Sequence, residues 1–275
     1  MPIECRDMGA PHFGLIVVGD EILSGKRSDR HFAAVVGLLK ARGLGLAWAQ
    51  FLSDERQAIA SVLRNSFASR DVVFCCGGIG ATPDDHTRQA AAQALSVELR
   101  LHPEAARLIA LRCAEMAAEG RGTADMTTPE NQQRLRMGEF PDGASIIPNS
   151  YNRIPGFSVA RHWFVPGFPA MAWPMLEWVL DTWYREHFNS IDFFERSMLV
   201  FDTPESAIAP LMEEIEARFN EVKLFSLPSM GDGKDGRSAR RHIELGVKGP
   251  TTAVKVAFDT LTAAVRRMGA PFELP

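Results

Sequence analysis

Short apolar runs alternate with helix-like stretches along the first part of the chain, and this alternation constrains the fold more than any other feature. FGLIVV (residues 13–18) is a continuous apolar run, typical of a strand that is buried on both faces. Apolar residues at helical spacing follow over 29–42. Further strand-like runs cover 44–52 and 71–76, with a second helical stretch between them. This order predicts an α/β fold with a mostly parallel sheet and helices on both of its faces.

The pattern restarts around residue 189, although no linker rich in Pro, Gly or Ser marks the boundary. We expect one α/β domain over residues 1–188 and a smaller α+β domain over residues 189–275. Before the boundary, helices are predicted at 102–120, from Thr128 onwards and at 171–188, and strands at 143–149 and 162–169. After it, a strand–helix–strand–strand–helix order is predicted at 197–202, 204–219, 221–227, 241–247 and 251–268. The glycine-rich, charged segment 229–240 is expected to be a mobile hairpin loop or a flap over a phosphate ligand.

Composition and charge narrow the function classes. Hydrophobic residues make up 46% of the 275 residues and charged residues 23%, and the net charge of −4 gives no general attraction to nucleic acid. The apolar runs are too short to cross a bilayer, and residues 1–14 lack the apolar core of a signal peptide. Cys75 and Cys76 lie in an apolar run, so we expect them to be buried and reduced. These features predict a cytoplasmic protein that binds neither nucleic acid nor membranes.

Polar and glycine-rich segments follow three of the predicted strands. VVGDE (17–21), LSDE (52–55) and GGIGATPDDHT (77–87) each begin where a strand is expected to end. Ligands bind outside the carboxyl ends of the strands in parallel sheets. We therefore expect these three segments to converge in space and to form a ligand site.

The segment GGIGATPDDHT has the composition of a phosphate-binding loop. Gly77, Gly78 and Gly80 allow positive φ angles and a close approach of the backbone to a ligand. The helix expected from about Asp84 would offer unpaired N–H groups to an anion, and Thr82 would add a hydroxyl donor.

Carboxylates beside this loop complicate a simple phosphate site. Asp84 and Asp85 would repel phosphate unless a divalent cation lies between them. Alternatively, one of the two caps the helix and the other is solvated. Asp54 has a similar alternative, because it is well placed to cap the helix that follows the second strand.

The combination of several motifs resembles a known family. These motifs are GDEILSG (19–25), LSDE (52–55), GGIGATPDDHT (77–87), PENQQ (129–133), PN (148–149), PGF (155–157) and PGFP (166–169). In consistent order over about residues 13–188, they resemble the molybdopterin-binding (MoaB/Mog-like) domain family. Within it, the likeness is greatest to the N-terminal domain of competence/damage-inducible protein A and to the corresponding domain of FAD synthase.

The resemblance implies a three-layer α/β sandwich with a pocket for a nucleotide or pterin phosphate. It implies that Asp54 and Asp85 are catalytic and that a divalent metal ion (Mg, Mn or Co) is held near Asp54, Asp84 and Asp85. Ligand contacts are expected from Gly19, Glu21, Gly77, Gly78, Gly80 and Thr82, and a pocket wall from Asn149, Pro166 and Gly167. By analogy with the family, a homo-oligomer is also expected.

The first loop, VVGDEILSGKRSD (17–29), is then a binding loop of this family and not a P-loop. Five residues separate its glycines where a P-loop has four, and Arg27 follows Lys26 where a P-loop has Ser or Thr. Lys26 is either a phosphate contact or solvated. His31 stands where relatives often have Asn, and it either touches the ligand or lies on the surface.

Three functions remain open. The first is metal-dependent hydrolysis of a dinucleotide pyrophosphate such as ADP-ribose or FAD. The second is transfer of an adenylyl group to molybdopterin, and the third is binding of molybdopterin without turnover.

Overall fold

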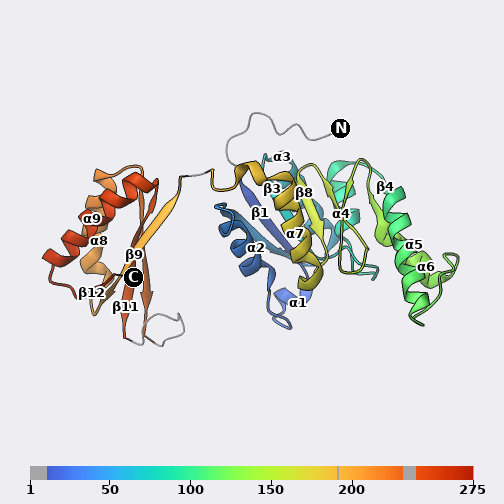
Figure 1. Cartoon of the computed structure of the whole chain (residues 1–275), viewed down its shortest axis with the longest axis horizontal. Coiled ribbons are helices and arrows are strands. Elements are labelled where there is room, and N and C mark those ends of the chain that lie inside the picture. Colours follow the sequence, from blue (N-terminus) through green and yellow to red (C-terminus); the bar gives the residue numbers. More distant parts are fainter. Residues whose placement is uncertain (1–10, 191, 232–239, 275) are drawn as a thin grey trace. The chain divides into compact units, whose positions relative to one another are not determined.

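The computed structural model describes residues 11–190, 192–231 and 240–274, and the chain divides into two compact units, Met1–Ser190 and Ile191–Pro275 (Figure 1). Each unit has its own sheet and its own apolar core.

The N-terminal unit is built on a six-stranded sheet with the order β2-β1-β3-β8-β7-β6. The strands are β1 (Phe13–Val18), β2 (Leu46–Leu52), β3 (Val72–Cys76), β6 (Ser145–Ile147), β7 (Gly156–Val159) and β8 (His162–Val165). β2, β1, β3 and β8 are parallel, whereas β7 and β6 are antiparallel to their neighbours. The predicted mostly parallel sheet is therefore confirmed. Its antiparallel strand β7 was not predicted, because four residues between two turns carry too little pattern.

Helices cover both faces of this sheet and complete a three-layer sandwich. One core lies between the sheet and the helices α2 (His31–Lys40) and α7 (Pro169–Trp183). The other lies between the sheet and the helices α3 (Arg56–Ala68) and α4 (Thr87–Leu95). The remaining elements are α1 (Asp20–Leu23), α5 (Pro103–Ala118), α6 (Pro129–Leu135), the 3₁₀ turns η1 (Arg136–Gly138) and η2 (Arg185–His187), and a ribbon of β4 (Leu99–Leu101) and β5 (Glu139–Pro141).

The continuous apolar character of the central strands follows from this double burial. Along β1, Leu15 packs on the α2 and α7 side, and Ile16 packs on the α3 and α4 side. Cys75 and Cys76 divide between the same two cores as free, buried thiols, as predicted. Burial raises the pKa of both thiols.

A carboxylate holds the start of α2. The two carboxylate oxygens of Asp29 accept hydrogen bonds from the backbone N–H groups of His31 and Phe32, at 2.9 Å each. These bonds satisfy two of the N–H groups that a helix leaves unpaired at its first turn.

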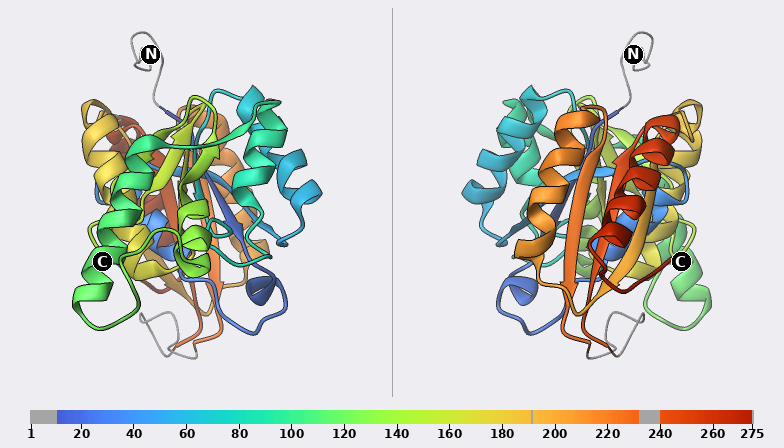
Figure 2. Two further views of the ribbon diagram at one scale, coloured as in Figure 1. Left: turned by 90° about the vertical axis from the view of Figure 1, so that its right-hand side faces the viewer. Right: turned by 90° about the vertical axis from the view of Figure 1, so that its left-hand side faces the viewer.

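The C-terminal unit is a four-stranded antiparallel sheet with the order β10-β11-β9-β12. Its elements are β9 (Phe194–Phe201), α8 (Glu205–Arg218), β10 (Lys223–Ser229), β11 (His242–Gly249), α9 (Thr251–Arg267) and β12 (Phe272–Glu273). The two helices lie side by side over one face of the sheet (Figure 2). The predicted element order is present, followed by the short strand β12. The loop predicted at 229–240 falls largely outside the described residues.

Among the described helices, none is both long enough and apolar enough to cross a membrane.

Two glycines should respond oppositely to the same substitution. A Cβ atom on Gly14 would lie 2.3 Å from the ring of Trp48, whereas a Cβ atom on Gly37 would meet nothing within 4 Å. Gly14→Ala should therefore lower the free energy of unfolding by about 1–3 kcal/mol. Gly37→Ala, inside α2, should raise it by about 0.5–1 kcal/mol. Urea unfolding of both variants measures this, and equal effects would contradict the packing described here.

Candidate ligand-binding site

A cavity of about 450 Å³ opens at the carboxyl ends of β1, β2, β3 and β8. The strand order reverses there, with β2 and β3 on opposite sides of β1, which is where open α/β sheets bind ligands. Every residue proposed for the site from the sequence lines this cavity: Gly19, Glu21, Asp54, Gly77, Gly78, Gly80, Thr82, Asp84, Asp85, Asn149, Pro166 and Gly167. Residues for which the sequence predicted no ligand contact line it too, among them Arg27, Met137, Phe168 and Met171.

The glycine loop, residues 77–82, is held from behind through its carbonyl oxygens. The donors are a backbone N–H group and the side chains of three residues from α4 and α6. Thr87 donates its hydroxyl to the carbonyl oxygen of Gly77 (3.0 Å) and its backbone N–H to that of Gly78 (2.9 Å). The guanidinium of Arg88 donates to the carbonyl oxygen of Gly80 (2.7 Å), and the amide of Gln133 donates to that of Ala81 (2.5 Å). The three donor residues lie outside the cavity lining, so these carbonyl groups turn away from the cavity.

The N–H groups of the same peptides point the other way. In a planar trans peptide the N–H and C=O bonds are antiparallel, so the N–H groups of Gly78, Ile79 and Ala81 point toward the cavity. In the described part of the N-terminal unit, these three groups and the N–H of Gly80 have no hydrogen-bond partner. A concave cluster of unpaired backbone N–H groups is a binding site for an anion.

Glycine is required at two positions of the loop. Gly77 has a φ of 105°, and a Cβ atom there would lie 2.3 Å from the carbonyl oxygen of Val18. Gly78 has a φ of 68°, and a Cβ atom there would lie 2.1 Å from Oγ1 of Thr87. A larger residue at either position would displace the loop or its partners.

Asp85 closes the loop. Its Oδ2 accepts hydrogen bonds from the N–H group (2.9 Å) and the hydroxyl (2.5 Å) of Thr82. The alternative that Asp84 or Asp85 caps the next helix is wrong, because α4 begins only at Thr87. His86 occupies the N-cap position there, without a side-chain hydrogen bond. The predicted helix start at Asp84 was three residues too early because the turn closed by Asp85 takes up those residues.

Asp54 joins the loop after β2 to the loop after β1. Its Oδ2 accepts a hydrogen bond from the N–H of Asp20 (2.9 Å), and its own N–H donates to Oδ1 of Asp20 (3.3 Å). The expectation that Asp54 caps α3 is wrong, since Glu55 is the N-cap residue and no side chain bonds there. The carboxylate of Asp54 is committed instead to the start of α1, beside the cavity.

Carboxylates gather on one side of the cavity. Asp20, Glu21, Asp54 and Asp84 line an adjoining shallow hollow, and Lys26 lies with them there, away from the glycine loop. As the side chains stand, no three His, Cys, Asp or Glu residues in the described ranges are close enough to hold a metal ion together. The donor type suits a divalent cation, and Mg²⁺ is commonly held by one or two carboxylates together with substrate phosphates and water.

Buried, hydrogen-bonded side chains hold the opposite wall of the cavity. Asn149 is buried, its amide group donates to Ile154 (2.9 Å), and its Oδ1 accepts from the N–H of Tyr151 (3.0 Å). His31 is also buried, and its Nε2 bonds to the carbonyl oxygen of Gly167 (2.9 Å). The prediction that His31 lies on the surface is therefore wrong. Its side chain supports the cavity wall from behind.

Sequence reasoning assigned no role to the residues behind the glycine loop. Gln133 lies in the PENQQ motif, which marked it as part of the family pattern without a role. Thr87 ends the GGIGATPDDHT motif, and Arg88 follows it directly. A charged residue in the first turn of a helix usually faces solvent, so only tertiary contacts could reveal that Arg88 is buried.

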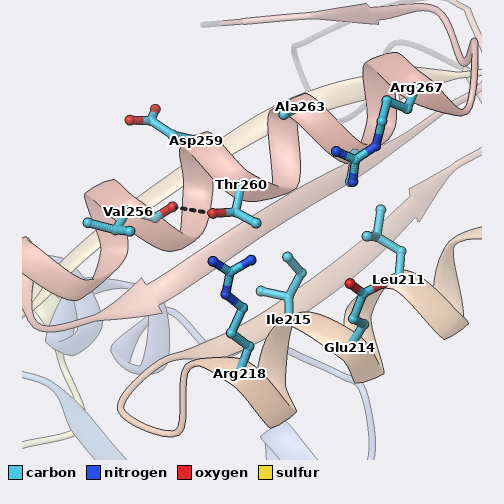
Figure 3. A pocket seen from close by; sticks show the side chains of 10 residues that line it. Leu211, Glu214, Ile215, Arg218, Val256, Asp259, Thr260, Ala263 and Arg267 are labelled. Atoms are coloured by element: carbon cyan, nitrogen blue, oxygen red, sulfur yellow. Dashed lines mark hydrogen bonds between the residues drawn. The ribbon is translucent and has the colours of Figure 1, made fainter.

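A second cavity of about 400 Å³ lies in the C-terminal unit, between α8 and α9 (Figure 3). Arg218 and Arg267 extend toward the space between the helices, and the Thr260 hydroxyl donates to the carbonyl oxygen of Val256 at 2.8 Å. This second cavity lies between the outer faces of the two helices and contains no glycine loop. The cavity of the N-terminal unit is therefore the candidate site.

Comparison with known proteins supports the same region. The family described as "Probable molybdopterin binding domain" matches residues 14–185, which is more than half of the chain. The chain belongs to this family. The resemblance drawn from the sequence motifs is confirmed, and the cavity lies within the matched residues of the molybdopterin-binding domain.

Individual relatives extend the likeness into the C-terminal unit. A protein from Pyrococcus abyssi is 30% identical over 227 residues, which cover 80% of this chain and 86% of that protein. A CinA-like protein from Chlorobium luteolum is 29% identical over 229 residues, which cover 80% of this chain and 51% of that protein. The chain thus matches about half the length of this CinA-like relative.

A solved structure shows the same fold. The crystal structure of CinA from Thermoplasma acidophilum covers 62% of this chain and 97% of its own, with a TM-score of 0.52 and 24% sequence identity.

The crowding of carboxylates around Asp54 should cost stability. Burial raises the pKa of Asp54, the hydrogen bond from Asp20 lowers it, and the charges of Asp20, Glu21 and Asp84 raise it further. Because the folded-state pKa is raised, the ionised form destabilises the folded state at pH 7, and this cost disappears as the pH falls through that pKa. Asp54→Asn should therefore raise the free energy of unfolding at pH 7 by about 0.5 kcal/mol, since solvent screens a partly exposed group.

The difference in free energy of unfolding between Asp54→Asn and the wild type should disappear at pH 3.5. Urea unfolding at pH 7 and at pH 3.5 measures it. Asp259→Asn, on the exposed surface of α9, is the control and should show no such dependence. An Asp54→Asn variant less stable than the wild type at pH 7 would contradict the argument.

Proposed function

We propose that the N-terminal unit binds the phosphates of a dinucleotide in the glycine loop and hydrolyses its pyrophosphate bond with the help of a divalent cation. One observation carries this proposal. Unpaired N–H groups of the glycine loop and the carboxylates of Asp54 and Asp84 face a single cavity of about 450 Å³.

Phosphate binding is supported by the loop geometry. The N–H groups of Gly78, Ile79 and Ala81 offer three donors to phosphate oxygens without any side-chain rearrangement. Arg27 lines the same cavity and can pair with a second phosphate at its rim. The apolar side chains of Met137 and Met171 supply surface for a ring system.

A divalent ion such as Mg²⁺, Mn²⁺ or Co²⁺ fits the donor set. Asp54 and Asp84 would hold it together with the phosphates of the ligand, and Asp85 would contribute through the oxygen that does not bond to Thr82. When bound, such an ion polarises a phosphoryl oxygen and offsets the negative charge that develops there.

The residues of the chain then have separate tasks. The glycine loop holds one phosphate so that the bridging P–O bond faces the carboxylates, and Asp54 accepts a proton from the attacking water. The water oxygen bonds to phosphorus as the bridging P–O bond breaks, which releases AMP and a second phosphate monoester.

A second candidate is favoured by the family itself. The matching family is described as binding molybdopterin, whose phosphate could occupy the same loop. In that case the protein either transfers an adenylyl group to the pterin or binds it without turnover. The same loop geometry supports both.

The release of AMP distinguishes these functions. The wild type should release AMP from ADP-ribose, FAD or NAD only in the presence of Mg²⁺, Mn²⁺ or Co²⁺. Asp54→Asn should lower this rate by about 100-fold or more, since it removes the proton acceptor and a metal ligand. Asp259→Asn in α9 is the matched control and should retain the full rate.

Asp85→Asn is a weaker test, because it also disturbs the turn at Thr82. A folded wild type that releases no AMP from these three compounds would contradict hydrolysis. Saturable binding of molybdopterin by that protein would then favour the second candidate.

A further inference from the structure

Arg88 is a buried cation directly behind the glycine loop. Its residue is only 4% exposed, although it stands in the first turn of α4. Its guanidinium group donates to the carbonyl oxygen of Gly80 (2.7 Å) and to that of Arg136, and its Nε has no hydrogen-bond partner among the described residues.

The charge of Arg88 is not neutralised by an ion pair. No carboxylate of the described residues lies within 4.0 Å of the guanidinium, and both of its hydrogen-bond acceptors are neutral carbonyl groups. Asp85 and Glu139 act on it only from farther away, and the like charge of Arg136 opposes them. Burying a charge without a partner destabilises the folded state, and an arginine does not escape this cost by losing its proton.

Holding the loop does not by itself require a charge. Gln133 holds the neighbouring carbonyl group of Ala81 with a neutral amide, and Thr87 holds those of Gly77 and Gly78 with a hydroxyl and a backbone N–H. Only at Gly80, in the described loop, is a cation used for this task. The charge therefore has a purpose beyond the hydrogen bond.

The cavity in front of the loop explains that purpose. Glu21, Asp54, Asp84 and Asp85 line it, and a phosphate entering between them meets unfavourable charge. A cation behind the loop, in surroundings of low polarity, offsets this repulsion and gains a counter-ion when the phosphate arrives.

We propose that Arg88 is a positioning residue that makes the glycine loop selective for anionic ligands, with its own charge balanced only when a phosphate occupies the loop. This inference rests on the proposed phosphate binding. It does not depend on whether the protein hydrolyses its ligand.

The test compares charged and neutral ligands. Calorimetric titration would measure the affinity for inorganic pyrophosphate, AMP and adenosine in the wild type, Arg88→Gln, Arg88→Lys and Arg64→Met. Arg64 is an exposed residue of α3 and serves as the control. Arg88→Gln should weaken binding of pyrophosphate and AMP by about 10-fold or more, because it removes the positive charge that attracts their phosphates. Its affinity for adenosine, which has no charge, should stay unchanged.

Arg88→Lys keeps the charge and should keep most of the preference for pyrophosphate over adenosine. If Arg88→Gln does not fold, the test rests on Arg88→Lys. Loss of the preference for pyrophosphate over adenosine in Arg88→Lys would overturn the proposal. Equal weakening of all three ligands by Arg88→Gln would show that Arg88 only holds the loop, and no weakening would show that its charge is irrelevant. A wild type that binds neither pyrophosphate nor AMP would instead overturn the proposed function on which this inference rests.

Discussion

The hydrogen bonds that draw the carbonyl groups of the glycine loop toward α4 and α6 are the constraint on which the site depends. They determine the direction of the opposing N–H groups, and they are made by Thr87, Arg88 and Gln133, which lie outside the cavity lining. Parallel pairing of β1 with β2 and β3 brings the carboxylates to the same place. The unpaired N–H groups and the carboxylates therefore lie at the same edge of the sheet, although different contacts position them.

The two halves of the site oppose each other electrostatically. Unpaired N–H groups and the buried Arg88 favour an anion in the cavity, whereas the carboxylates of Asp54 and Asp84 oppose one. Under the proposed function, a divalent cation offsets this repulsion, so that the site selects an anion that arrives with a metal ion. Crowding of like charges lowers the stability of the free protein. It is common at functional sites, where residues serve function at a cost in folding stability.

The sequence predicts the first level of this organisation well. Continuous apolar runs identify β1 and β3, and the rule that ligands bind at strand ends brings together the segments 17–21, 52–55 and 77–87, which all line the cavity. It fails where tertiary contacts override local pattern. Asp54 has the spacing of a helix cap but bonds to Asp20, and Arg88 has the position of a solvated residue but is buried. The short strand β7 is recognisable only beside β8.

The most direct measurement is an NMR titration of the backbone amide signals with pyrophosphate. We expect saturable downfield shifts of the Gly78, Ile79 and Ala81 amide protons, because these N–H groups gain hydrogen bonds to phosphate oxygens. Amides of the C-terminal unit should stay unchanged. Binding that leaves these three signals in place and shifts signals of residues elsewhere would contradict the glycine loop as the phosphate site.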